Sequence, residues 1–154
     1  QNRANEREVL GVDYDADKIE IANNCYSKND QINFQAADIR ELEVQDASAV
    51  FLNDVVHYLP EEDHEPLLQK CLDGIQEGGV LIVRDGITDL GDRHKKTELT
   101  EKYSTQIIGF NKASNELCFF SREFIEKFAE KNGLTCEVKE QSSKTSNILF
   151  IIKK

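Results

Sequence analysis

The sequence predicts an α/β fold whose mostly parallel sheet ends in an antiparallel hairpin, and two observations support this. Short apolar runs alternate with helical patterns over most of the chain, which is typical of strand–helix–strand crossovers and a parallel sheet. The last two apolar runs, 134–141 and 147–152, are joined only by the polar link 142–146. A parallel return needs about a dozen residues or more, so these two strands must be antiparallel if they are neighbours.

The first strand and helix are expected in residues 9–26. The apolar run that starts at Val9 closes on the acids Asp13 and Asp15, and Asp15 is placed to cap a helix. We expect that helix to carry a partly buried stripe made of Ile19, Ile21, Ala22 and Cys25. The alternating run 32–36 predicts a second strand. Both strands therefore deliver an acid at their carboxyl end, where open α/β sheets bind nucleotides and related cofactors.

The third strand, 47–52, is apolar and is expected to be buried on both faces. The next helix should start near Asp63 and run to the Gly78–Gly79 pair, which is expected to stop it before a fourth strand at 80–83. Such a strand–helix–strand unit implies parallel neighbours and a right-handed connection.

The pattern loosens over residues 86–110, and this segment is either a lid over a site or an ordinary connecting helix. Ser121 then caps a clear helix over residues 122–132, which Gly133 closes. With 154 residues and no internal repeat or linker, the chain is expected to form a single domain. It starts with Gln and contains no Met, which favours a piece of a longer protein.

Composition argues against several partners. A net charge of −10 opposes binding to nucleic acid, and the nearest basic cluster, 93–96, is short. The four cysteines lack the paired spacing of a metal site, so we expect reduced, mostly buried thiols and a cytoplasmic protein. No apolar run approaches the length that crosses a bilayer. The histidines His64 and His94 are expected to face solvent.

The order of these motifs resembles the class I S-adenosylmethionine-dependent methyltransferases. The runs Leu10-Gly11-Val12-Asp13 and Ala36-Ala37-Asp38-Ile39 look like that family's second and third strand ends, and residues 49–60 look like its fourth strand and loop. The double glycine and the final helix also match. The resemblance implies a Rossmann-like sheet, S-adenosylmethionine as cofactor and a small-molecule methyl acceptor.

The resemblance also assigns roles to individual residues. Asp13 would hold the ribose hydroxyls and Asp38 the adenine amino group, while Tyr14, Ala37 and Ile39 would cover the ring. Alternatively, Asp13 is a helix-proximal acid without a ligand, and Asp38 only caps a turn.

Two further positions follow the third strand. Asn53 would contact the cofactor or merely cap the strand end. His57 would act as a general base, because a neutral imidazole can accept a proton, or would simply be part of the loop. Arg84 and Asp85 follow the fourth strand and could face the acceptor.

The chain departs from the family in one respect, since no GxG sequence occurs anywhere in it. The family's glycine-rich turn follows its first strand, so the first strand and helix are expected to be lacking and the domain incomplete at its N-terminus. The chain alone is then expected to be inactive, and a homodimer could cover the gap in the sheet. The alternatives are a degenerate Rossmann-like domain that binds or self-associates without catalysis and, less favoured, an NAD-dependent oxidoreductase.

Overall fold

The computed structural model describes residues 7–25, 28–90, 117–140 and 147–154. The chain divides into two compact units, Gln1–Leu42 and Glu43–Lys154, and each is considered by itself. The expected lid or connecting helix at 86–110 falls largely outside the described residues.

Unit 1 is a strand–helix–strand motif. It contains β1 (Val9–Asp13), α1 (Ala16–Asn23) and β2 (Ile32–Ala36), and the two strands pair in parallel from Val9↔Ile32 to Asp13↔Ala36. Asp15 caps α1 as predicted, because its carboxylate accepts a hydrogen bond from the backbone N–H of Asp17 at 3.0 Å.

The partly buried stripe expected on α1 is confirmed only for Ile19 and Ala22, which are half-buried. No residue of α1 is buried, Ile21 is 73% exposed and Cys25 is exposed as well. The helix stays largely exposed because, within the described part of unit 1, it packs only against a two-stranded sheet, which is too small to cover it. The periodicity identified the helix correctly, but burial depends on layers that unit 1 does not provide.

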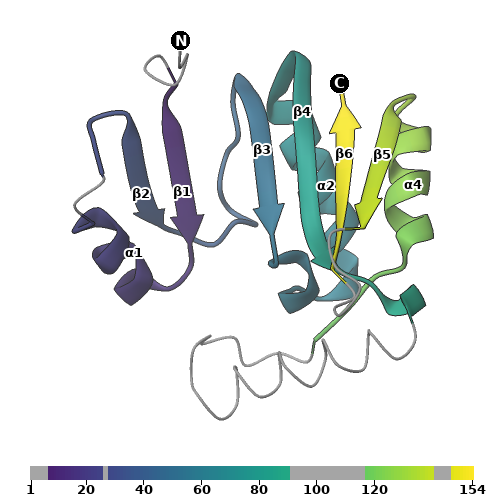
Figure 1. Ribbon diagram of the computed structural model, residues 1–154, viewed down its shortest axis with the longest axis horizontal. Coiled ribbons are helices and arrows are strands. Elements are labelled where there is room, and N and C mark those ends of the chain that lie inside the picture. Colours follow the sequence, from purple (N-terminus) through teal and green to yellow (C-terminus); the bar gives the residue numbers. More distant parts are fainter. Residues whose placement is uncertain (1–6, 26–27, 91–116, 141–146) are drawn as a thin grey trace. The chain divides into compact units, whose positions relative to one another are not determined.

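Unit 2 is built on a four-stranded sheet in the order β3-β4-β6-β5 (Figure 1). The four strands are β3 (Ala47–Asn53), β4 (Ile75–Gly86), β5 (Thr135–Glu140) and β6 (Asn147–Lys153). β3 and β4 run parallel, whereas β6 is antiparallel to both β4 and β5. The predicted parallel crossover and the closing antiparallel hairpin are both confirmed.

Four helical segments complete unit 2 as far as it is described. The α-helices are α2 (Glu61–Gly74) and α4 (Arg122–Lys131), and the short 3-10 helices are η2 (Val56–Tyr58) and η3 (Thr88–Leu90). Ser121 caps α4 as predicted, accepting from the N–H of Phe124 at 3.2 Å. The ring of His64 on α2 lies 6.2 Å from that of Phe124 on α4, so the two helices pack together.

The core of unit 2 lies between these helices and one face of the sheet. Alternate residues of the central strands, such as Leu81 and Val83 on β4 and their partners on β6, are fully buried there. The largest fully buried apolar side chains are Phe150, Leu68, Ile75, Leu81, Ile87, Ile125, Ile152, Val56 and Val83.

The opposite face of this sheet is only partly covered. Phe51 is 65% exposed, and its register partner Ile82 and the neighbouring Ile151 are half-buried. Burial of strand 47–52 on both faces is therefore wrong for this chain. The strand is as apolar as a central strand, but within the described part of unit 2 the α-helices cover one face only.

The boundary between α2 and β4 also differs from the prediction. α2 begins at Glu61 and ends at Gly74, and the Gly78–Gly79 pair lies inside β4. A Cβ at Gly74 would lie 2.2 Å from the carbonyl oxygen of Val44, so this glycine permits a close backbone approach. Gly78 has φ +76° and sits where the register of β3 and β4 shifts.

Candidate functional site

Asp13 ends β1 and stands beside the segment that follows β2. The backbone N–H of Ala37 donates to the carbonyl oxygen of Asp13 at 3.0 Å, which extends the ladder to this point. Oδ1 of Asp13 accepts from the N–H of Asp15 at 2.9 Å, and Oδ2 lies 4.0 Å from Nζ of Lys18. The Asp13 side chain is 38% exposed, so its carboxylate is oriented yet reachable by a ligand.

Asp38 lies two residues beyond β2, and its carboxylate forms an ion pair with the side chain of Arg40. Nε of Arg40 lies 3.0 Å from both Asp38 oxygens, and Nη2 lies 2.5 Å from Oδ2. Among the flanking residues, Ala37 and Ile39 are half-buried and Tyr14 is 49% exposed. The fold of unit 1 thus brings together five of the predicted cofactor residues, at the carboxyl ends of two parallel strands.

A second polar cluster lies at the carboxyl ends of β3 and β4. Asn53 is exposed, and its amide nitrogen lies 3.4 Å from Oδ2 of Asp54. Arg84 forms an ion pair with that same oxygen, while the amide of Asn147 donates to Oδ1 of Asp54 at 3.0 Å. Burial raises the pKa of Asp54, and the nearby Arg84 opposes the rise.

Sequence reasoning missed Asp54 as the centre of this cluster. An aspartate directly after an apolar strand was the available signal, and its φ of 51° shows that it also makes the turn out of β3. The contribution of Asn147 carried no sequence signal, because it is 93 positions away and is brought there by the antiparallel pairing of β6.

His57 lies in η2, between β3 and α2, and is only 1% exposed. Nδ1 of its ring contacts Oδ1 of Asp85, a residue of β4 that is completely buried. The ring of Phe119 stacks on it at 4.9 Å with an interplanar angle of 9°. The sequence left open that Asp85 faces an acceptor, but its carboxylate is completely buried inside the protein.

The expectation that His64 faces solvent is wrong. His64 is 2% exposed, its Nε2 lies 3.0 Å from the carbonyl oxygen of Leu59, and the rings of Phe120 and Phe124 pack against it edge-on. Its position on α2 faces α4, which the sequence pattern alone did not reveal. His94 lies outside the described residues.

The four cysteines are free, and only Cys71 is buried, so the expectation of mostly buried thiols is only partly met. Burial raises the pKa of the Cys71 thiol to about 11. The described residues contain no cluster of His, Cys, Asp and Glu that could hold a metal ion.

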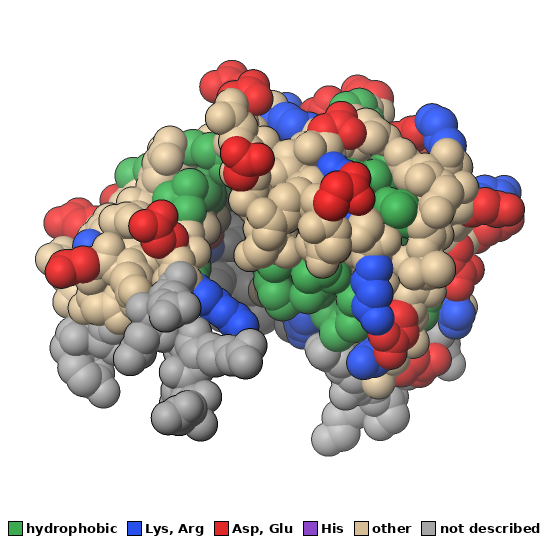
Figure 2. Space-filling model, turned by 90° about the horizontal axis from the view of Figure 1, so that it is seen from above, with side chains coloured by type: hydrophobic (Ala, Val, Ile, Leu, Met, Phe, Trp, Pro, Cys, Tyr) green, Lys and Arg blue, Asp and Glu red, His purple; other side chains and the backbone are tan. Residues whose placement is uncertain are grey.

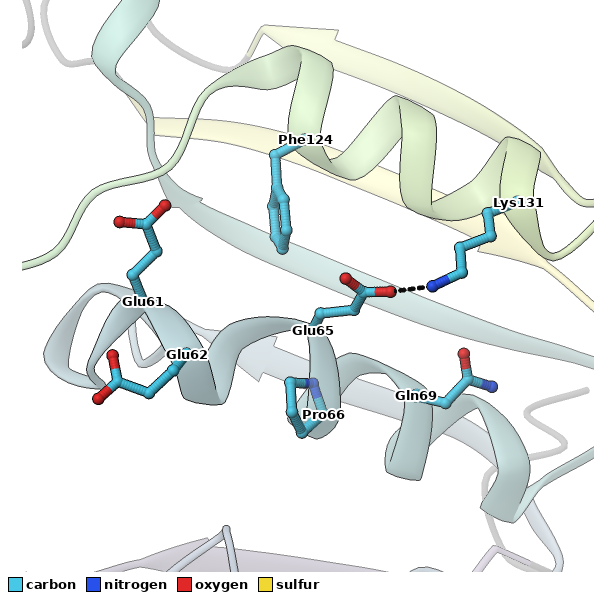
Figure 3. A pocket seen from close by; sticks show the side chains of 7 residues that line it. All are labelled: Glu61, Glu62, Glu65, Pro66, Gln69, Phe124 and Lys131. Carbon is cyan, nitrogen blue, oxygen red and sulfur yellow. Dashed lines mark hydrogen bonds and ion pairs between the residues drawn. The ribbon is translucent and has the colours of Figure 1, made fainter.

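A shallow groove lies between α2 and α4 and is separate from the strand ends (Figure 3). Three glutamates of α2 line it with Phe124, and Lys131 of α4 reaches across to pair with Glu65. None of the predicted site residues lines this groove. Its open shape gives a cofactor no enclosed surface, so the strand ends remain the candidate site.

The visible surface agrees with the acidic composition. Acidic side chains lie at many points on the face shown in Figure 2, and the described residues present no extended basic area there. None of the helices in the described ranges is long and apolar enough to cross a bilayer.

Comparison with known proteins bears directly on this arrangement. A family model described as a methyltransferase domain matches residues 1–79, slightly more than half of the chain. The chain belongs to this methyltransferase family. S-adenosylmethionine is the cofactor of the class I methyltransferases, the group to which the family belongs.

Relatives of this methyltransferase domain include carboxy-S-adenosyl-L-methionine synthases. The protein from Aliivibrio fischeri (strain MJ11) is 28% identical over 147 residues, which are 93% of this chain and 51% of that protein. The protein from Shewanella baltica (strain OS155) is 36% identical over 64 residues, or 42% of this chain and 26% of that protein. The chain spans about half the length, or less, of the curated relatives that it matches.

Solved methyltransferases share the fold. Human N-acetylserotonin methyltransferase in complex with S-adenosylmethionine aligns with a TM-score of 0.65 at 18% identity, covering 96% of this chain and 40% of that one. Magnesium protoporphyrin IX methyltransferase from Synechocystis aligns with a TM-score of 0.66 at 14% identity, covering 96% and 64%.

Within each of its two sheets, the strand order of this methyltransferase domain agrees with part of the family's order 3-2-1-4-5-7-6. Its two sheets, β2-β1 and β3-β4-β6-β5, correspond to family strands 3-2 and 4-5-7-6. The described residues contain no counterpart of family strand 1, in agreement with the absence of a GxG sequence. The predicted fold class is therefore confirmed.

Proposed function

We propose that this chain is part of an enzyme that transfers a methyl group from S-adenosylmethionine to a small molecule. One observation carries the proposal: β1 and β2 pair in parallel and end on Asp13 and on the segment 37–39, which includes Asp38. Parallel strand ends of this kind are where open α/β sheets bind nucleotide cofactors.

The residues of unit 1 fit the nucleoside part of the cofactor. Asp13 is ionisable, partly exposed and oriented by the N–H of Asp15, so its carboxylate can accept from both ribose hydroxyls. Asp38 would accept from the adenine amino group, with Tyr14, Ala37 and Ile39 around the ring. Arg40 donates hydrogen bonds to Asp38 in the structure. When adenine binds, the carboxylate must therefore accept from both groups, or its hydrogen bonds with Arg40 must break.

Unit 2 supplies the residues proposed for the reacting end. Asn53 would contact the amino-acid portion of the cofactor, and His57 would accept the proton of the methyl acceptor. The bound cofactor supplies an activated methyl group on a sulfonium. Since the His57 ring is buried, an acceptor reaches it only when an adjoining aromatic side chain, Tyr58 or Phe119, moves aside.

We also propose that the cofactor site is complete only with a further strand and glycine-rich turn. Among the described strands, β1 and β3 each have a hydrogen-bonded neighbour on one side only, as expected if a strand is missing between their family counterparts. Alternatively, a second copy of the chain covers the open edge of the sheet. The oligomeric state in solution distinguishes a missing strand from a homodimer.

The test is the identity of the products. The protein, with residues upstream of Gln1 restored, is incubated with methyl-labelled S-adenosylmethionine and a panel of phenols, carboxylates and amines. We expect the label in an acceptor together with an equal amount of S-adenosylhomocysteine. The Asp13→Asn variant should lose both products and Glu20→Gln, an exposed charge on α1, should lose neither. Failure of the unmodified protein to bind the cofactor would favour a degenerate scaffold without catalysis.

A second candidate reaction is the one named by its relatives, the synthesis of carboxy-S-adenosyl-L-methionine. The identity of 28–36% to these synthases favours it, although the matched regions cover about half of each protein or less. Here the cofactor itself would be modified. This reaction also needs a second substrate that donates the carboxyl group, so the assay is repeated with candidate carboxylate donors. Mass spectrometry of the nucleoside products then discriminates, because carboxylated S-adenosylmethionine would appear in place of S-adenosylhomocysteine.

A further inference from the structure

Asp54 joins three segments that are far apart in the sequence. Its backbone N–H donates to the carbonyl oxygen of Arg84 at 2.8 Å, which continues the pairing of β3 and β4 by one residue. Oδ2 of its side chain forms an ion pair with the Arg84 guanidinium, and Oδ1 accepts from the amide of Asn147 at 3.0 Å. A single carboxylate therefore connects the end of β3 with the end of β4 and the start of β6.

The same carboxylate orients the neighbouring side chain of Asn53. The amide nitrogen of Asn53 lies 3.4 Å from Oδ2 of Asp54. An ionised carboxylate can only accept hydrogen bonds, so the Asn53 amide must present its nitrogen, and not its oxygen, to Asp54. Asn53 is exposed at the carboxyl end of β3. Its amide oxygen is therefore left to accept a hydrogen bond from a ligand.

The charge on Asp54 does not favour the folded state. Burial raises the pKa of the Asp54 carboxyl, and the nearby Arg84 opposes the rise. Of the other charged groups around it, Asp85 adds to the rise and His57 opposes it. Because the folded protein holds this proton more tightly than the unfolded chain, the group favours folding at low pH. That contribution is lost as the pH rises through the pKa of the folded state.

Asn147 shows a second cost in the same cluster. Its amide nitrogen faces Asp54, and its amide oxygen is buried without a hydrogen-bond partner among the residues that the structure describes. An unsatisfied buried oxygen and a partly buried charge both reduce stability. Polar clusters with such costs are more typical of functional sites than of purely structural contacts.

We propose that Asp54 is a positioning residue, which holds the Asn53 amide so that its oxygen accepts a hydrogen bond from the ammonium group of S-adenosylmethionine. The inference rests on the proposed function, in which Asn53 contacts the amino-acid portion of the cofactor. Asp54 acts through Asn53, while Arg84 and Asn147 fix its two carboxylate oxygens.

Asp54→Asn tests the inference in the protein with its upstream residues. Asparagine also adopts the left-handed φ of 51° found here, so the substitution removes the charge and keeps the backbone. An amide can offer either its oxygen or its nitrogen to Asn53, which then loses its fixed orientation. Calorimetric titration should show S-adenosylmethionine binding weakened about three- to tenfold, as for one lost hydrogen bond. The urea midpoint at neutral pH should stay the same or rise, whereas a purely structural role predicts that it falls.

Asp46→Asn is the matched control. Asp46 directly precedes β3, is exposed and has a φ of 50°, so the same substitution is made in the same backbone conformation. We expect Asp46→Asn to change neither the affinity for S-adenosylmethionine nor the urea midpoint.

A second measurement uses no cofactor. In ¹⁵N NMR of the ligand-free protein, the side-chain amide signals of Asn53 and Asn147 should titrate with one shared pKa, above the usual range of an aspartate. The shared titration should be absent in Asp54→Asn and unchanged in Asp46→Asn.

Three results would overturn the inference: unchanged cofactor affinity in Asp54→Asn, loss of folding in Asp54→Asn, or an Asn53 amide signal that does not follow the titration of Asp54. If the unmodified protein binds no S-adenosylmethionine, the proposed function fails together with the contact to the ammonium group. If it binds but Asp54→Asn binds equally well, only the positioning role fails, so the two failures are distinguishable.

Discussion

The carboxylates at the strand ends differ in their exposure and in their hydrogen-bond partners, so they differ in how easily a ligand can reach them. Asp13 is held by one backbone N–H and remains partly exposed, whereas Asp38 is gripped by Arg40 and Asp85 is wholly enclosed. The sequence predicted correctly that Asp13 and Asp38 lie at strand ends, because an acid that follows an apolar run is a visible pattern. It could not reveal the enclosure of Asp85, which depends on contacts with η2 across 28 positions.

Arg40 provides a prediction at this scale. Arg40→Ala should strengthen the binding of S-adenosylmethionine by up to about fivefold, because an exposed ion pair stabilises by about 0–1 kcal/mol and its loss releases the Asp38 carboxylate. Calorimetric titration of the protein with its upstream residues measures the change. Glu41→Gln, a neighbouring charge on the surface, is the matched control. Weaker binding by Arg40→Ala would instead mean that Arg40 itself contacts the cofactor.

At the scale of elements, periodicity and caps located the strands and helices well but their contacts poorly. The caps Asp15 and Ser121 and the final hairpin were predicted correctly, since these depend on local sequence. The end of α2 was misplaced because the Gly78–Gly79 pair is a stronger turn signal than Gly74. Only the tertiary approach of Val44 explains why the earlier glycine matters.

Gly74 gives the corresponding prediction. An alanine in a helix normally stabilises by about 0.5–1 kcal/mol relative to glycine, but here its Cβ would lie 2.2 Å from a backbone carbonyl oxygen. The clash should win, so Gly74→Ala should lower the free energy of unfolding by about 1–3 kcal/mol. Asp73→Ala, the adjacent exposed position, should change it by less than about 0.5 kcal/mol. Urea denaturation compares the two, and equal stabilities would refute the close approach.

At the scale of the whole molecule, the two units differ in how much core they have. The described part of unit 2 encloses many apolar side chains, whereas Asp15 is the one buried residue among those described in unit 1. A strand–helix–strand motif of this size cannot be stable through its own core. Val9, Leu10 and Phe51 are apolar residues of the predicted strands, and their side chains are exposed to solvent in this chain.

The central claim is that Asp13 lies in an S-adenosylmethionine site that is complete only with a further strand and glycine-rich turn. Calorimetric titration with S-adenosylmethionine tests it most directly. The 154-residue chain should bind weakly or not at all, the protein with its upstream residues should bind clearly, and Asp13→Asn in that protein should weaken binding at least about tenfold, as expected for a lost hydrogen bond to a charged group. Glu20→Gln should bind like the unmodified protein. Tight binding by the 154-residue chain, or binding unaffected by Asp13→Asn, would contradict the claim.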